Sequence, residues 1–202
     1  MIPVNSVKKE ESDLQIPNNT IQLAMFDLDG TLFDTRQANY MAYCEACGSE
    51  FPMTQEFFNQ FCMSYSYRKF LPLLGVPEER LLEIHDKKIK CYTDYFHKIR
   101  ENKALFALIF LLKKEKIPVS LVTTASRSGT CELLKYFGYT GIFDLLVTQE
   151  SVSRLKPAPD AYQYAMEHFH AEPQKCIIFE DSPVGMQAAK ASGAVAFCVS
   201  QF

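Results

Sequence analysis

The chain has 202 residues, of which 48% are hydrophobic and 22% are charged, and its formal net charge is −3. This composition is typical of a soluble globular protein, and the length fits one domain or one domain with a modest insertion. A net negative chain without a basic stripe cannot neutralise a nucleic-acid backbone. The sequence therefore argues against non-specific nucleic-acid binding.

Residues 1–20 are polar and lack the apolar core of a signal peptide, so we expect a loosely held leader there. The seven cysteines are odd in number and scattered, which argues against a disulfide framework. Cys44 and Cys47 form a single C-x-x-C pair, and we interpret them as reduced cysteines because no second pair completes a zinc site. The predicted location is cytoplasmic.

Residues 21–26 form a short apolar run that predicts a buried strand. Residues 35–100 follow as a mostly helical stretch, with Asp34-Thr35 as its expected first cap and an amphipathic helix over 78–99. The run 104–112 is the most hydrophobic in the chain, but a bilayer span takes about 20 residues. We predict a helix buried against a sheet there, with a dimer contact as the alternative.

Strands and helices alternate in the rest of the chain. The expected strands cover 117–123, 143–148, 175–180 and 194–199, and the expected helices cover 127–137, 159–169 and 183–192. Such alternation implies right-handed βαβ units and a parallel sheet. The predicted fold class is α/β, a Rossmann-like parallel sheet flanked by helices. Its core comprises residues 21–34 and 101–202, and the helical block 35–100 is an inserted subdomain.

Two carboxylates, Asp27 and Asp29, end the first predicted strand, and Gly30 follows them. Side chains at i and i+2 of an extended segment point the same way, so both acids are expected to face one pocket. A divalent cation or a shared proton relieves their repulsion, and Gly30 lets backbone N–H groups turn toward an anion. Thr123 and Asp181 also fall at carboxyl ends of predicted strands, where ligands of parallel sheets bind.

Four motifs resemble those of the haloacid dehalogenase-like hydrolases, a superfamily dominated by magnesium-dependent phosphatases. They occur in the family's order as FDLDGTLFDT (26–35), SLVT (120–123), RLKPAP (154–159) and IIFEDSPVG (177–185). The resemblance runs from about residue 21 to 199. The helical block is similar to the small α-helical cap of the phosphoglycolate phosphatase and β-phosphoglucomutase branch, which implies hinges near 34–36 and 99–103.

The resemblance implies a catalytic role for the acids. Asp27 is the expected nucleophile, forming an aspartyl-phosphate, and Asp29 is the expected general acid for the leaving oxygen. The implied cofactor is Mg²⁺, held by Asp27, by the backbone carbonyl of Asp29, by Asp181, and by Glu180 directly or through water.

The resemblance also implies groups that bind the substrate. The Thr123 hydroxyl and the Lys156 ammonium are expected to bind phosphoryl oxygens, helped by backbone N–H groups at Gly30 and Thr124. Three cap residues either clamp an anionic or sugar portion of the substrate or form a charged surface, namely Tyr65, Arg68 and Lys69.

The leading hypothesis is a Mg²⁺-dependent phosphatase of a small phosphorylated metabolite, either a sugar phosphate, a phosphoglycolate-like acid or a nucleotide. We expect a monomer or weak homodimer without nucleic-acid or membrane partners. One alternative is a phosphomutase, weakened because Asn39 stands near the position where many members carry a histidine. The other is a non-catalytic binding or regulatory protein. The usual Pro-Gly before the helix that leads to the second motif is replaced by RENK at 100–103.

Overall fold

The computed structural model describes residues 21–62, 66–200 and 202 of the chain. The predicted leader over 1–20 and Tyr65 lie outside the described residues. None of the helices in the described part is long and apolar enough to cross a membrane. All seven cysteines are free thiols.

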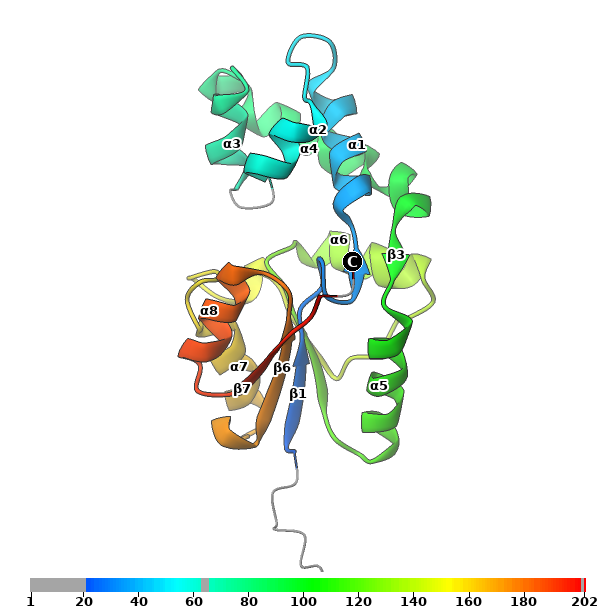
Figure 1. Ribbon diagram of the computed structural model, residues 1–202, viewed down its shortest axis with the longest axis vertical. Helices are drawn as coiled ribbons and strands as arrows, with labels where there is room; N and C mark the ends of the chain where they lie inside the picture. Colours follow the sequence, from blue (N-terminus) through cyan, green and yellow to red (C-terminus); the bar gives the residue numbers. More distant parts are fainter. Residues whose placement is uncertain (1–20, 63–65, 201) are drawn as a thin grey trace, which may run out of the picture.

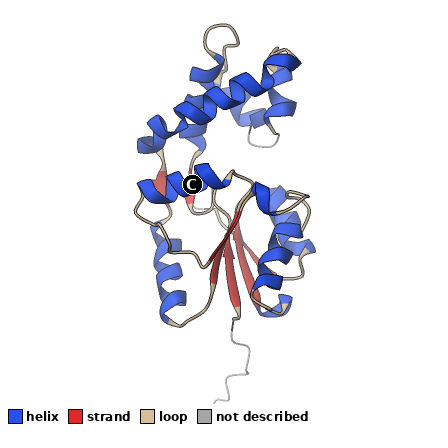
Figure 2. Cartoon of the chain, turned by 180° about the vertical axis from the view of Figure 1, so that it is seen from behind, coloured by secondary structure: helices blue, strands red, loops and turns tan. Residues whose placement is uncertain are grey.

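A five-stranded sheet forms the centre of the larger body of the molecule (Figures 1 and 2). In spatial order its strands are β5 (Leu145–Val147), β4 (Val119–Val122), β1 (Leu23–Phe26), β6 (Cys176–Glu180) and β7 (Val195–Cys198). Every pairing in this sheet is parallel. All four residues of the central strand β1 are buried, as a strand covered on both faces requires. The predicted α/β fold with a parallel sheet is confirmed.

Helices cover both faces of the sheet. They are α5 (Lys103–Lys114) and α6 (Arg127–Tyr136) on one face, and α7 (Asp160–His168) and α8 (Pro183–Ala191) on the other. Alternate side chains of β1 serve the two cores: Ala24 and Phe26 face α5 and α6, whereas Leu23 and Met25 face α7 and α8. Two short 3-10 segments, η4 (Gln149–Ser151) and η5 (Pro173–Lys175), complete the larger body.

Local sequence explains where the core helices begin. Asn102 caps α5 by accepting a hydrogen bond from the Leu105 N–H at 3.1 Å. The Ser182 hydroxyl accepts from the Gly185 N–H at 3.0 Å at the start of α8, where Pro183 occupies the first helical position. Both are side-chain caps of the kind that satisfies the unpaired N–H groups of a first turn. The helix ends lie within two residues of those predicted.

A second, helical body lies beyond the carboxyl ends of the strands (Figure 1). Its elements are α1 (Arg36–Cys47), α2 (Gln55–Phe57), the π-helical η1 (Phe58–Cys62), α3 (Tyr67–Leu73), the 3-10 segment η2 (Glu78–Arg80), α4 (Leu81–Tyr92) and the 3-10 segment η3 (Thr93–Lys98). It has its own apolar core, which includes Phe58, Phe70, Leu71 and Ile84. We call this helical body the cap.

Two strand segments connect the cap to the larger body. They are β2 (Phe33–Asp34) and β3 (Arg100–Glu101), which pair antiparallel, and Arg100 forms an ion pair with Asp34 across them. This ribbon lies where the two hinges are predicted. The two segments that connect the cap to the larger body are therefore hydrogen-bonded to each other rather than separate.

The predicted continuous helix over 78–99 is corrected by the structure. The α-helical part is α4 alone, and the segments on either side of it, η2 and η3, are 3-10 helices. Thr93 and Asp94 at the break are weak helix formers, and a 3-10 turn is a common way for a helix to tighten at its end. Side chains after Tyr92 therefore leave the face that the 3.6-residue period predicts.

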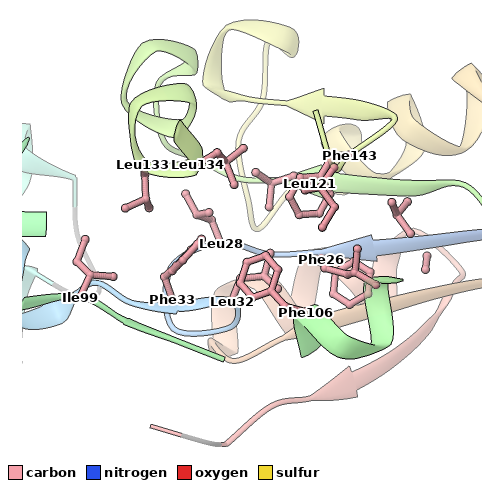
Figure 3. Close-up of a cluster of buried hydrophobic side chains, with 14 of the residues drawn as sticks. Phe26, Leu28, Leu32, Phe33, Ile99, Phe106, Leu121, Leu133, Leu134 and Phe143 are labelled. Carbon is pink, nitrogen blue, oxygen red and sulfur yellow. The ribbon is translucent and has the colours of Figure 1, made fainter. Parts of the chain in front are cut away.

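We predict that Phe106→Ala lowers the free energy of unfolding by about 3–5 kcal/mol, because the ring fills a closed core. Phe106 is 2% exposed and stacks on Tyr139 at 3.8 Å between ring centroids, and the Phe33 ring lies at 5.3 Å (Figure 3). Urea unfolding measures the loss. Leu111→Ala, on the same helix but 60% exposed, is the control, expected to cost about 0.5 kcal/mol or less. Equal losses in the two variants would contradict this packing.

Candidate active site

The predicted site residues meet at one edge of the sheet. Asp27 directly follows β1, Thr123 follows β4, and Glu180 and Asp181 stand at the end of β6. Backbone hydrogen bonds fix these ends, because the Asp27 N–H donates to the Phe179 carbonyl at 3.0 Å on the neighbouring strand. Ligand oxygens of Asp27, Glu180 and Asp181 lie within 4.8 Å of one another.

Lys156 lies at the centre of this acidic group. Its Nζ donates to Asp27 Oδ1 at 2.6 Å, to Glu180 Oε1 at 2.7 Å and to the Val122 carbonyl at 3.0 Å. These bonds use all three protons of an ammonium group. The side chain is 5% exposed, so Lys156 is buried and neutralises two carboxylates rather than standing in solvent.

Glu180 accepts a hydrogen bond from Lys156 and has further donors of its own. Its side chain is 1% exposed. Its Oε1 also accepts from the Tyr162 hydroxyl at 3.4 Å, and its Oε2 accepts from the Ser182 N–H at 3.0 Å and the Ser182 hydroxyl at 3.1 Å. Because both oxygens already have protein donors, the structure favours Glu180 as the anchor of Lys156 over a direct metal ligand.

Burial shapes the protonation of the acids. It raises the pKa of Asp27, although the charge of Lys156 opposes it, and it raises the pKa of Asp29, with the Thr35 hydroxyl opposing. Burial and the charge of Glu180 raise the pKa of Asp181 to about 6. Lys156 stays charged, because the neighbouring acids outweigh its own burial and raise its pKa above the ordinary value.

The acidic group fits a divalent cation. Three carboxylates share one lysine, so the group carries an excess of negative charge when all are ionised. Within the described residues, Oδ2 of Asp27 and Oδ2 of Asp181 make no hydrogen bond and remain available as ligands. Carboxylate oxygens of this kind suit Mg²⁺.

Gly30 lies against the Asp181 carboxylate, where no side chain would fit. Its φ is 91°, and a Cβ there would lie 2.1 Å from Asp181 Oδ2. Its N–H, predicted to face a phosphate, instead donates to the Phe33 carbonyl at 2.7 Å and closes the turn. Thr31 on the same turn donates to Asp181 Oδ1 at 3.3 Å. The structure thus gives Gly30 the role of close approach to Asp181 in place of anion binding.

The two threonines after β4 differ in their surroundings. Thr123 is 3% exposed, and its hydroxyl oxygen accepts from the Ala125 N–H at 3.0 Å, which leaves the hydroxyl proton free to donate. Thr124 is exposed at the same edge. Both residues therefore lie at the carboxyl end of β4, the strand that pairs with β1.

Thr35 corrects a local prediction. It precedes α1, but its side chain makes no cap hydrogen bond, and its hydroxyl donates to Asp29 Oδ1 instead. Asn39 on α1 donates to the Thr35 carbonyl at 3.1 Å and to the Tyr92 hydroxyl at 3.5 Å. The carboxylate of Asp29 is thus connected to two cap helices by side chains that sequence reasoning did not connect.

Asn102 is a second residue whose role the sequence did not reveal. It is fully buried, and besides capping α5 it donates from its backbone N–H to the Leu32 carbonyl at 2.8 Å and from Nδ2 to the Thr31 carbonyl at 3.1 Å. It therefore ties the hinge to the loop that carries Asp29. An amide side chain directly before an apolar helix is a cap signal that can be recognised in the sequence. Its hydrogen bonds to a distant loop cannot be predicted from the sequence.

Two residues predicted to bind substrate, Arg68 and Lys69, differ in burial from Lys88, which the sequence analysis does not single out. Arg68 and Lys69 are exposed, and the Arg68 guanidinium carbon lies 5.1 Å from the Tyr67 ring centroid. Lys88 on α4 is half-buried, and burial lowers the pKa of Lys88 to about 8, with the charge of Asp29 opposing. Lys88 therefore lies within electrostatic reach of the site.

The model of the haloacid dehalogenase-like hydrolase family matches residues 24–199. The chain belongs to this family. It is therefore an enzyme of the hydrolase class, and the family predicted from the four motifs is confirmed.

Relatives of known name agree with this membership. The chain is 27% identical over 180 residues to a phosphorylated carbohydrates phosphatase of Thermotoga maritima, covering 86% of this chain and 82% of the relative. It is 27% identical over 182 residues to a fructose-1-phosphate phosphatase of Escherichia coli, covering 84% and 91%. The fold is similar to that of CbbY from Rhodobacter sphaeroides, with a TM-score of 0.80 at 23% identity, covering 91% and 88%.

We predict that Gly185→Ala destabilises the protein although alanine is the better helix former. The added Cβ would lie 1.6 Å from Glu180 Oε1, so the carboxylate that accepts from Lys156 must move. Disturbing a buried, charged hydrogen bond costs about 1–3 kcal/mol, against a helix-propensity gain of about 1 kcal/mol. Thermal unfolding measures the change, with Gly129→Ala in α6, near only the Ser126 hydroxyl, as the control. A Gly185→Ala protein as stable as this control would refute the packing.

We predict that Mg²⁺ raises the melting temperature more at pH 8 than at pH 5. Folded Asp181 keeps its proton up to a pKa of about 6, above the 3.8 of an unperturbed carboxyl. In the metal-free protein its contribution to stability therefore falls as the pH rises between these values. Mg²⁺ competes with the same proton, so its effect grows over that range. Thermal shifts with and without Mg²⁺ test this, and Asp181→Asn should lose the response; a pH-independent response would contradict it.

Proposed function

We propose that the chain is a Mg²⁺-dependent phosphatase of a small phosphorylated metabolite that works through an aspartyl-phosphate on Asp27. The observation that carries the proposal is the position of Asp27 at the end of the central strand, with Oδ1 bonded to Lys156 and Oδ2 without a hydrogen bond among the described residues. The phosphatases among the relatives support phosphoric monoester hydrolysis.

The first half of the reaction forms the covalent intermediate. One carboxylate oxygen of Asp27 attacks phosphorus, which leaves the other carboxylate oxygen for the metal, and the bond between phosphorus and the leaving alcohol oxygen breaks. Asp29 donates its proton to that oxygen. Burial raises the pKa of Asp29, which favours the protonated carboxyl group that this step needs.

The second half returns the enzyme to its starting state. Asp29, now ionised, accepts a proton from water as the water oxygen attacks the phosphorus of the aspartyl-phosphate. The bond between phosphorus and Asp27 breaks, and inorganic phosphate leaves. The hydrogen bond from Thr35 holds the Asp29 carboxylate in place through both steps.

The remaining site residues neutralise charge. Asp27, Asp181 and the backbone carbonyl of Asp29 would hold the Mg²⁺, which when bound offsets negative charge on the phosphoryl oxygens. The charge of Lys156 opposes the rise that burial causes in the pKa of Asp27 and so favours the ionised nucleophile, and the Thr123 hydroxyl would donate to a phosphoryl oxygen.

The setting of the enzyme is proposed on separate grounds. Seven free thiols support a reducing compartment, and we keep the cytoplasm as the proposed location. A small phosphorylated molecule is the proposed partner, and a monomer or weak homodimer the proposed state. The cap, which is connected through the β2–β3 ribbon, would cover the site and exclude bulk solvent while admitting the one water that hydrolyses the aspartyl-phosphate.

We predict that Asp27→Asn abolishes phosphate release while the fold stays intact, because the amide is not a nucleophile. Asp29→Asn should lower kcat by about 10²–10⁴, the typical contribution of a general acid. Phosphate release from sugar phosphates, nucleotides and small phospho-acids, with and without Mg²⁺, measures both. Substantial turnover by Asp27→Asn would refute the nucleophile. Isomerised sugar phosphate without free phosphate would identify a phosphomutase instead.

A further inference from the structure

Tyr162 on α7 is a buried tyrosine that the proposed reaction does not use. It is 0% exposed and lies in the apolar cluster between the sheet and the helices α7 and α8. A phenylalanine ring would fill this space equally well, and a hydroxyl group buried there costs stability unless it finds a hydrogen-bond partner. The Tyr162 hydroxyl donates to Glu180 Oε1, the oxygen that also accepts from Lys156. The hydroxyl therefore belongs to the charged group at the site.

The hydrogen bond from Tyr162 to Glu180 is long. The Tyr162 hydroxyl oxygen lies 3.4 Å from Glu180 Oε1, whereas Lys156 Nζ lies 2.7 Å from the same oxygen. An ordinary O–H···O hydrogen bond spans about 2.7–2.8 Å. The ammonium is therefore the main donor to Glu180 Oε1, and the hydroxyl is a second donor beside it. The Tyr162 ring also lies near the ammonium, with 5.0 Å between Nζ and the ring centroid.

Lys156 has no proton to spare for a substrate. Its three protons go to Asp27 Oδ1, to Glu180 Oε1 and to the Val122 carbonyl. A phosphoryl oxygen that binds to the ammonium must therefore replace one of these acceptors. Of the three, Glu180 Oε1 is the one that has a second side-chain donor within the described residues. The bond to Glu180 is therefore the least costly one for Lys156 to give up.

Glu180 is shielded from water that could replace the lysine as a donor. Its side chain is 1% exposed. If Lys156 turned away and no other donor reached Oε1, the unpaired carboxylate oxygen would weaken phosphoryl binding about 10-fold or more. The Tyr162 hydroxyl avoids this loss by moving to an ordinary hydrogen-bond length as the ammonium leaves.

We propose that Tyr162 is a positioning residue that lets Lys156 exchange its bond to Glu180 Oε1 for a bond to a phosphoryl oxygen. The hydroxyl becomes the main donor to Glu180 while the phosphoryl group is bound, and the ammonium returns to Glu180 when phosphate leaves. No proton is transferred, and the buried carboxylate keeps a donor in both states. This rests on the proposed function, which places a phosphoryl group beside Asp27 and Lys156.

Binding of inorganic phosphate in the presence of Mg²⁺ tests this without relying on turnover. Tyr162→Phe keeps the ring and removes the hydroxyl, and we expect it to weaken phosphate binding about 10-fold in calorimetric titration. The KM of any phosphomonoester that is turned over should rise by a similar factor, with a smaller change in kcat. Tyr164→Phe is the matched control, because Tyr164 lies on the same helix, is 42% exposed and should keep the full phosphate affinity.

A merely structural role for Tyr162 predicts a different pattern. Lost packing would lower the melting temperature of the phosphate-free protein and leave the phosphate affinity of the folded protein unchanged. In the proposed role most of the loss appears only with phosphate, because Lys156 still donates to Glu180 without it. Glu180→Gln removes the charge that needs the second donor, so Tyr162→Phe added to that variant should change the phosphate affinity little further. Melting temperatures establish that each variant is folded.

Crystal structures with Mg²⁺, with and without phosphate, follow the exchange directly. We expect the Tyr162 hydroxyl to approach Glu180 Oε1 from 3.4 Å to about 2.7 Å while Lys156 Nζ moves to a phosphate oxygen. A Lys156 that keeps its contact with Glu180 in the phosphate complex would overturn the exchange.

The binding results separate the two proposals. Equal phosphate affinities of Tyr162→Phe and Tyr164→Phe, an equal effect of Tyr162→Phe with and without Glu180→Gln, or no phosphate binding by the unaltered protein would each overturn the role of Tyr162. Silence of the unaltered enzyme in phosphate release, together with phosphate binding that depends on Tyr162, would overturn the phosphatase and leave this role standing. Phosphate release that is indifferent to Tyr162→Phe would do the reverse.

Discussion

The contact between Lys156 and its two carboxylates is the interaction on which the site depends. An ammonium and two acids that are almost fully buried would be costly to desolvate separately. They are tolerated because each ammonium proton has an acceptor and Glu180 has further donors from Ser182 and Tyr162. The ends of β1, β4 and β6 must therefore stay in register, since each supplies one acceptor of this lysine.

The cap and the larger body are joined by polar contacts as well as by chain. The buried Asn102 bonds to the loop between β1 and β2, and Thr35 and Asn39 connect Asp29 with Tyr92. A change in the cap position would disturb the partners of the general acid before it disturbed the nucleophile. The hydrogen bonds of Asp27 therefore come from the larger body, whereas the surroundings of the Asp29 carboxylate depend on the cap.

The elements that the sequence predicts correctly are those marked by a few neighbouring residues. Features that depend on packing between distant segments were not predicted. The strand of β1 and the apolar helix α5 were predictable from short apolar runs, and Asp181 from its place at a strand end. The break of the predicted helix 78–99 after Tyr92 was not, since packing rather than the apolar period decides where it tightens. Thr35 carried a sound cap signal, yet its hydroxyl found a buried acid as a competing acceptor.

The sequence by itself determined the α/β order of elements, the family and the acids at the strand ends, because each follows from periodicity or from residues close together in the chain. Only the tertiary structure decided how these groups share protons and charge. Lys156 and Asp27 are 129 residues apart, and their contact exists because β1 and the loop after β5 meet at one edge of the sheet.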